Sequence, residues 1–315
     1  MTNKIAFIGA GIATSYTLIP LIEKLLVKPK NVEIYIIDKS EDFFSGLPYG
    51  ERSGESVLLI NNLKSFIPTP HRDDLKKWLN DNLNALLERF LKNGDALAKS
   101  WVDKNNNAII NGEWDQLYVP RFFFGLYIKQ KVNKIVEQAA KSGHIKITLI
   151  KKETKNIKYI SDGFEISFED KKTLVCDKAI LSIGSLPNKS LLSKDKYLNN
   201  NNAIYINQLY NPNLDTNLEI VQKTILFRSE KKLATNILIL GANASGLEAI
   251  YRTYGSSLSI NYQDCNFTCL STHGVMPDGQ IDEQKLKKFR TTHLNSLVLD
   301  SSLTANKIAT AVNQD

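Results

Sequence analysis

The chain has 315 residues, enough for two domains of ordinary size, and its 43% hydrophobic and 23% charged residues are typical of a globular protein. Its net charge of +7 comes from lysines scattered among many acidic residues, so we expect neither a nucleic-acid nor a membrane partner. Its three cysteines lack the spacing of a disulfide framework or a zinc site, which favours a cytoplasmic protein without a metal. Glycines, a proline and a glutamate interrupt the apolar N-terminal segment, which is typical of neither a signal peptide nor a membrane span.

A strand, a glycine turn, a helix and a second strand open the chain. Residues 4–8 are short and apolar, and residues 12–26 have the apolar spacing of a helix. Residues 32–37 form the next apolar run, which ends at Asp38. This order predicts a βαβ unit with a parallel sheet and therefore an α/β fold.

The other elements follow in chain order. We expect loops over 43–70, an amphipathic helix over 72–92, a polar insertion or surface loop over 92–114, a helix within 119–143 and a strand over 145–151. The turn at 161–163 predicts a β-hairpin. Residues 189–235 are rich in asparagine and predicted to be irregular, whereas 236–255 repeat the strand–turn–helix pattern and 265–271 supply the next strand. From about Asp282 the sequence is charged and at best helical.

The first glycine turn reads "GAGIAT" and has the residues that a dinucleotide site needs. Gly9 permits the sharp turn after the strand, and Gly11 leaves room for a pyrophosphate to approach the backbone. Ile12 and Ala13 begin the helix whose free N–H groups face the phosphate charge. Thr14 stands where a third glycine would serve helix–strand packing.

Asp38 ends the second strand, where a carboxylate can accept hydrogen bonds from ribose hydroxyls. We count the adjacent Lys39 with the same site. An acidic residue there disfavours a 2′-phosphate, so FAD or NAD fits this first turn better than NADP.

The second turn reads "GANASG" and contains Gly241, Asn243, Ser245 and Gly246. Asn243 replaces the central glycine, and we expect it to adopt a positive φ there. A second nucleotide and a purely structural turn both remain open. The following "STHG" offers only His273 as a cation for a 2′-phosphate, so we expect no strong preference for NADPH over NADH. Two such turns suit an enzyme that passes a hydride from a nicotinamide to a flavin.

These residues resemble a family of FAD/NAD(P)-binding proteins related to flavin-dependent urate hydroxylase and aspartate N-monooxygenase, and more distantly to ornithine and lysine N-hydroxylases. The similar segments, in order, are "GAGIAT", "SGLPYG" with "LLINNLKSFIPTPHRDDLKKWL", "VPRFFFGLYI", "GANASGLEA" and "CLSTHGVMP". The resemblance implies FAD at the first turn, a nicotinamide cofactor at the second, and an FAD-dependent monooxygenase that hydroxylates or oxidises a small molecule. It implies no catalytic side chain, because the flavin carries the oxygen chemistry.

The resemblance also divides the chain into domains. It implies two Rossmann-like domains: an FAD-binding domain with a loop-rich insertion over 1–188 and a partial NAD(P)-binding domain with a C-terminal tail over 236–315. An irregular connection over 189–235 joins them.

Several further residues have both a cofactor-binding and a structural interpretation. Tyr49 either lies near the flavin or packs within a loop, and Asn61 and Asn62 either contact the flavin ring or turn the loop. Arg121 either contacts a cofactor phosphate or forms a surface salt bridge. Gly184 ends a strand in a Gly-x-x-Pro turn and is counted with the cofactor site.

The chain departs from the family at Thr14, at Asn243 and at the missing Arg-Arg pair. It also ends at Asp315 without a counterpart of the family's closing segment. We therefore expect a flavin site open at one edge, poor turnover with release of peroxide, and completion of the site by a second copy or a partner chain. The alternative is a truncated, split or degenerate FAD/NAD(P)-binding protein without independent catalysis.

Overall fold

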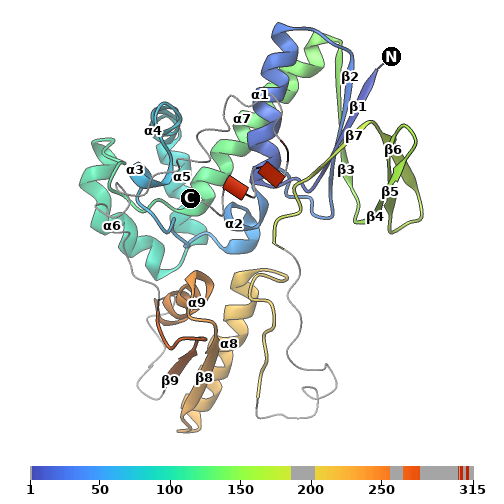
Figure 1. Ribbon diagram of the computed structural model, residues 1–315. Helices are drawn as coiled ribbons and strands as arrows, with labels where there is room; N and C mark the ends of the chain where they lie inside the picture. The colour runs from blue at the N-terminus through green and yellow to red at the C-terminus, as the bar shows by residue number, and fades with distance from the viewer. Residues whose placement is uncertain are drawn as a thin grey trace.

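A computed structural model describes residues 2–185, 203–255 and 265–276, together with residues 304, 306, 307, 310 and 311. Figure 1 shows a larger part that contains β1 to β7 and a smaller part that contains α8, β8, α9 and β9. Most of the tail predicted from Asp282 onward and residues 186–202 of the predicted connection lie outside the described residues.

The larger part is built on a four-stranded sheet in the order β3-β2-β1-β7. Its strands are β1 (Asn3–Ile8), β2 (Val32–Asp38), β3 (Ile145–Lys151) and β7 (Lys178–Leu181), and every pair is parallel. Helix α1 (Ile12–Val27) connects β1 to β2, so the predicted βαβ unit is confirmed. Parallel strands end at the same edge of a sheet, which brings residues 9, 38 and 182 together.

Both faces of this sheet are covered, as a parallel sheet requires. Helices α1 and α7 (Arg121–Ser142) pack on one face, where Phe7 and Ile34 are fully buried (Figure 1). The antiparallel strands β4 (Thr154–Ile160), β5 (Gly163–Phe168) and β6 (Thr173–Cys176) cover the other face, against Ala6 and Ile8. The predicted hairpin at 161–163 joins β4 to β5 and is confirmed.

A helical insertion lies between β2 and α7. It contains α2 (Gly46–Tyr49), the 3-10 turn η1 (Glu51–Ser53), α3 (Leu63–Phe66), α4 (His71–Asp81), α5 (Leu83–Asn93) and α6 (Ala96–Ile110). Of the two alternatives for 92–114, the surface loop is wrong, because residues 96–110 form a helix within this insertion. Asp95 caps this helix, and Ala98, Trp101 and Ile109 bury one side of it.

The smaller part contains α8 (Leu214–Glu230), β8 (Thr235–Leu240), α9 (Ala244–Gly255) and β9 (Cys265–Leu270). Strands β8 and β9 are parallel, so the second strand–turn–helix–strand pattern is confirmed. The prediction of an irregular connection over 189–235 is wrong for residues 214–230. Helix α8 forms because Asn213 accepts a hydrogen bond from Thr216 N at 2.8 Å, and Leu214, Leu218 and Ile225 bury one helix face.

Across the described residues, no helix combines the length and the apolar character that crossing a membrane requires. The same ranges contain no group of three or more histidine, cysteine, aspartate or glutamate side chains placed to hold a metal ion.

Candidate cofactor site

The first glycine turn leaves β1 beside the end of β7. Gly9 has a φ of 98°, and a Cβ added there would lie 2.1 Å from the carbonyl oxygen of Ser182. Its N–H donates to the carbonyl oxygen of Ile37 at 2.8 Å, which fixes the turn to β2. Only glycine fits this position, for reasons of both backbone conformation and space.

Gly11 has more open surroundings than Gly9. Its φ is −86°, which any residue adopts, and an added Cβ would meet only Gly46 Cα, at 3.5 Å. An alanine side chain would therefore fit beside Gly46, so packing within the protein does not itself require glycine at this position. Phe44 N donates to the carbonyl oxygen of Ala10 at 2.6 Å, and Ser15 Oγ donates to the carbonyl oxygen of Phe44 at 2.8 Å. The turn is thus bordered by a second glycine, Gly46, which sequence reasoning did not single out.

Helix α1 starts at this turn with N–H groups that the protein does not use. Gly11 is the N-cap and has no side chain to accept from them. Within the described part of the chain, no protein group accepts a hydrogen bond from the N–H groups of Ile12 or Ala13. Such N–H groups, together with the helix dipole, favour the binding of an anion such as a pyrophosphate at the start of α1.

Asp38 lies against the same turn. Its Oδ2 accepts from Ala10 N at 2.8 Å, and its Oδ1 accepts from Ser40 N at 2.8 Å. The carboxylate is therefore held at the mouth of the turn, and its free lone pairs can accept ribose hydroxyls. Lys39, beside it, is exposed to solvent.

In both turns, the residue at the place of the third glycine lies against the carbonyl oxygen of the turn's first glycine. These residues are Thr14 against Gly9 and Gly246 against Gly241. Thr14 is fully buried, and its hydroxyl donates to Gly9 O. In the second turn a Cβ on Gly246 would lie 2.1 Å from Gly241 O. Thr14 therefore replaces the close packing of a third glycine by a hydrogen bond.

The second turn connects β8 to α9. Gly241 has a φ of 108° and donates its N–H to the carbonyl oxygen of Leu270 at 2.8 Å. The predicted positive φ of Asn243 is wrong, because the non-glycine residues with positive φ in the described chain are Phe44, Lys171 and Lys232. The central position of this turn, like Gly11, needs no left-handed backbone. His273 is exposed after β9.

Asn62 and Tyr49 are engaged within the protein. Asn62 caps α3 by accepting from Ser65 N at 3.0 Å, and its amide nitrogen donates to Gln116 Oε1 at 3.2 Å. The ring of Tyr49 packs edge-on against Phe124, with centroids 5.0 Å apart, and burial raises the pKa of its hydroxyl. These contacts match the structural interpretations of both residues.

Two other predicted site residues lie outside the helices and strands. Asn61 is partly exposed in the loop before α3. Gly184 is exposed after β7 with a φ of 67°, near the edge of the sheet at which the first turn lies.

Arg121 forms an internal ion pair in place of the surface salt bridge that the sequence suggested, and its contact with a cofactor phosphate stays a prediction. Its Nε donates to the carbonyl oxygen of Leu58 at 2.9 Å, and Nη1 lies 2.9 Å from Glu248 Oε2 in a buried ion pair. Glu248 belongs to α9, so Arg121 connects the two parts of the molecule. The prediction of a surface salt bridge is therefore corrected to an internal one.

A hydrogen-bond network continues from Glu248 to the second turn. The Tyr210 hydroxyl donates to Glu248 Oε1 at 2.8 Å and lies 3.3 Å from the hydroxyl oxygen of Ser245. Burial raises the pKa of Glu248, and Arg121 acts in the opposite direction. Burial likewise raises the pKa of Tyr210, which keeps its hydroxyl available as a donor. One of the second-turn residues, Ser245, is thus engaged within the protein.

Comparison with known proteins gives the family. Residues 6–186, more than half of the chain, match the model of the FAD-NAD(P)-binding family, and the chain belongs to that family. Its cofactor is FAD, with NADH or NADPH as the partner cofactor that the family admits. The narrower resemblance to urate hydroxylase and aspartate N-monooxygenase stays a prediction.

Two curated relatives are uncharacterized proteins of Mycobacterium tuberculosis and Mycobacterium bovis. Each is 27% identical over 100% of this chain and 59% of the relative. The chain therefore spans less than two thirds of the length of these relatives.

Two solved structures cover 99% of this chain at low similarity. Lysine monooxygenase NbtG from Nocardia farcinica is 10% identical, with 70% of its own chain covered and a TM-score of 0.44. A flavin-containing monooxygenase from Stenotrophomonas maltophilia is 8% identical, with 68% covered and a TM-score of 0.42. Both scores lie below the level at which a shared overall arrangement follows.

The residues of the first turn fit FAD. The open backbone at Gly11, the unused N–H groups of Ile12 and Ala13 and the anchored carboxylate of Asp38 supply the donors and the acceptor that an adenosine diphosphate moiety requires.

Proposed function

We propose that this chain is the nucleotide-binding part of an FAD-dependent oxidoreductase of the monooxygenase type, which uses NAD(P)H to hydroxylate or oxidise a small molecule. The observation that carries the proposal is the first turn, where unused N–H groups lie beside the carboxylate of Asp38. Membership of the FAD-NAD(P)-binding family supports it.

In this proposal Gly9, Gly11, Ile12 and Ala13 receive the pyrophosphate, and Asp38 accepts the ribose hydroxyls. Bound FAD supplies the redox chemistry, since it can take a hydride from NAD(P)H and pass electrons to oxygen. The protein's own task is to orient the cofactor and exclude water.

The proposed division into domains follows the two turns. Residues 1–188 would bind FAD, residues 236–315 would contain the NAD(P) site, and residues 189–235 would connect them. The parallel β8–α9–β9 unit, with its own glycine turn at Gly241, supports a second nucleotide site. Gly241, Asn243, Ser245 and Gly246 are its proposed contacts.

The test is an FAD titration of the purified chain and of two matched aspartate variants, followed by flavin fluorescence and absorbance. Asp38→Asn leaves one oxygen for two backbone N–H groups and the ribose, so we expect about tenfold weaker FAD binding, near 1.4 kcal/mol. The control is Asp170→Asn. Asp170 also accepts a backbone N–H, from Lys172 at 3.2 Å, but lies in the β5–β6 turn on the far side of the sheet.

Wild-type affinity for FAD is expected in the Asp170→Asn control. A chain that takes up no FAD, or an Asp38→Asn variant that binds FAD as well as the control does, would contradict the proposal. The first result would favour a nucleotide-binding relative without flavin chemistry.

A further inference from the structure

Helix α9 carries two buried charges on one face. Glu248 and Arg252 are four residues apart, which places them on the same side of the helix. Only 8% of Glu248 and 6% of Arg252 are exposed. Charged side chains are rarely this buried unless they are paired, and each of these two pairs with a residue of the larger part.

Glu248 makes the first of these connections. Its partner Arg121 begins α7 and is itself held by the carbonyl oxygen of Leu58. The other carboxylate oxygen accepts from Tyr210, whose hydroxyl lies beside Ser245 in the second glycine turn. The Tyr210 hydroxyl therefore connects the ion pair to the turn that would hold the nicotinamide nucleotide.

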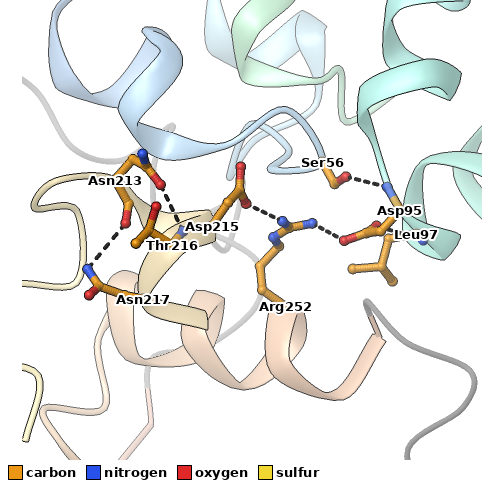
Figure 2. A network of polar contacts seen from close by, with 8 residues as sticks. All are labelled: Ser56, Asp95, Leu97, Asn213, Asp215, Thr216, Asn217 and Arg252. Carbon is orange, nitrogen blue, oxygen red and sulfur yellow. Dashed lines mark hydrogen bonds and ion pairs between the residues drawn. The ribbon is translucent and has the colours of Figure 1, made fainter. Parts of the chain in front are cut away.

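Arg252 makes the second connection (Figure 2). Its Nη1 donates to Asp95 Oδ2 at 2.5 Å, and its Nη2 donates to Asp215 Oδ1 at 2.6 Å. Asp95 is fixed as the N-cap of α6, where it accepts from Leu97 N at 2.9 Å. Asp215 lies in the first turn of α8. A single guanidinium thus joins α9 to α6 of the larger part and to α8 of the smaller part.

The surrounding contacts are close but contain little apolar surface. A Cβ on Gly255 would lie 2.3 Å from Leu97 Cδ2, so the end of α9 lies directly against α6. The buried apolar cluster across this junction, among the described residues, consists of Val57, Leu214 and Leu218. Because apolar contacts are non-directional and few here, the charged contacts set the orientation of α9.

We infer that Glu248 and Arg252 are positioning residues, which hold the second glycine turn at a fixed place relative to the first. The inference rests on the proposed function, in which each turn anchors one nucleotide and the hydride must cross between them. Neither side chain is proposed to touch the reacting atoms. The relative placement of the two turns decides whether the nicotinamide reaches the flavin.

Removing either charge should move α9 away from α6 and α7 without unfolding either part, while Arg52 still donates to the carbonyl oxygens of Tyr210 and Pro212 before α8. The remaining partner, Arg121 or Asp95, would otherwise stay partly buried without a counter-charge, which is unfavourable. It regains water if α9 moves away from α6 and α7. The expected consequence is a loosened junction with an intact FAD domain.

The first experiment measures the junction without any cofactor. Leu97→Cys and Gly255→Cys are introduced together, because these positions are in contact, and formation of the bridge is followed under mild oxidation by mass spectrometry. We expect the added Arg252→Met or Glu248→Gln substitution to slow bridge formation by about tenfold or more.

The control is Arg89→Met, which breaks an ion pair of similar length but greater exposure, Arg89 Nη2 to Glu55 Oε1 at 2.6 Å, inside the larger part. It should leave the bridging rate unchanged. Equal bridging rates with and without the α9 charges would overturn the inference.

The second experiment uses the FAD-loaded chain, mixed with NADH or NADPH without oxygen. Arg252→Met and Glu248→Gln should lower the reduction rate per bound flavin by about tenfold or more at saturating nucleotide, because small misplacement of reacting groups is costly. The nucleotide concentration that gives half of the maximal reduction rate should change by less than about threefold. A merely destabilising effect would instead lower the amount of bound FAD.

The Leu97→Cys/Gly255→Cys bridge should restore the rate in both charge variants, and a reductant of disulfides should abolish the rescue. Wild-type reduction rates in the charge variants would overturn the positioning role and leave the proposed function intact. If neither nucleotide reduces the wild-type flavin, the proposed function fails, and the bridging rates still decide whether the charges position α9.

Discussion

Replacing Gly11 by alanine should separate cofactor binding from folding. The φ of −86° suits alanine, and its Cβ would meet only Gly46 Cα, at the ordinary contact distance of 3.5 Å. Alanine is a poorer N-cap than glycine, which costs roughly 0.5–1 kcal/mol, but it restricts the unfolded chain by about 0.4–1 kcal/mol. The two effects nearly cancel, so the free energy of unfolding should stay close to wild type.

FAD binding should change much more. In the proposed site the added methyl group reduces the space that the pyrophosphate needs at Gly11, and overpacking of this kind costs about 1–3 kcal/mol. That range corresponds to FAD binding weakened by roughly five- to 150-fold. Flavin fluorescence titration gives the affinity, and urea unfolding of the cofactor-free protein gives the stability.

The control for this substitution is Gly143→Ala. Gly143 ends α7 with a φ of 75°, and nothing lies within 4 Å of an added Cβ. This change should cost about 1 kcal/mol of stability through backbone strain and leave FAD affinity unaltered. If Gly11→Ala binds FAD as tightly as wild type, the pyrophosphate does not lie at this turn.

Three further predictions concern specificity and stability. Titration with NADPH and with NADH should give affinities that differ by less than about tenfold, or 1.4 kcal/mol, because His273 is the only cation that "STHG" offers for a 2′-phosphate. A larger preference for NADPH would contradict this. Thr14→Val should lower the free energy of unfolding by about 1 kcal/mol, because the hydrogen bond from the Thr14 hydroxyl to the carbonyl oxygen of Gly9 is lost, and should leave FAD affinity unchanged. An unaltered free energy of unfolding in urea would show that this bond is unimportant. The hydrogen bond to Glu33 raises the pKa of Tyr35 to about 12 from 10.0, so its stabilising contribution is complete below pH 10 and is lost as the pH rises toward 12. Tyr35→Phe should abolish that part of the alkaline destabilisation, and identical pH–stability curves would refute the assignment.

The parts of the fold that sequence reasoning predicted depend on local patterns. The first βαβ unit, α7 with its C-terminal Gly143 and the hairpin at 161–163 are each marked by apolar periodicity and a turn residue close by in the chain. Helix α8 was missed because asparagines were interpreted as irregularity. Asn213 is in fact its cap, and the buried Asn217 donates to the carbonyl oxygen of Leu209 at 2.7 Å.

The role of Arg121 could not be predicted from the sequence, because it depends on a partner far away in the chain. Nothing near Arg121 indicates that Glu248 lies against it, and the same holds for Arg252 and Asp95. The first turn was easier to predict, because Gly9, Gly11 and Asp38 belong to one βαβ unit. Gly46 was missed as a neighbour of that turn because its contact with Gly11 requires the loop after β2 to fold back.

The most direct test of the proposed function is reduction of the FAD-loaded chain by NADH or NADPH in the absence of oxygen, followed by flavin absorbance. If the two turns hold FAD and NAD(P)H as proposed, the oxidised flavin absorbance is lost with either nucleotide and returns when oxygen is admitted. An oxidised spectrum that persists with both nucleotides, in protein shown to hold FAD, would contradict the proposed function.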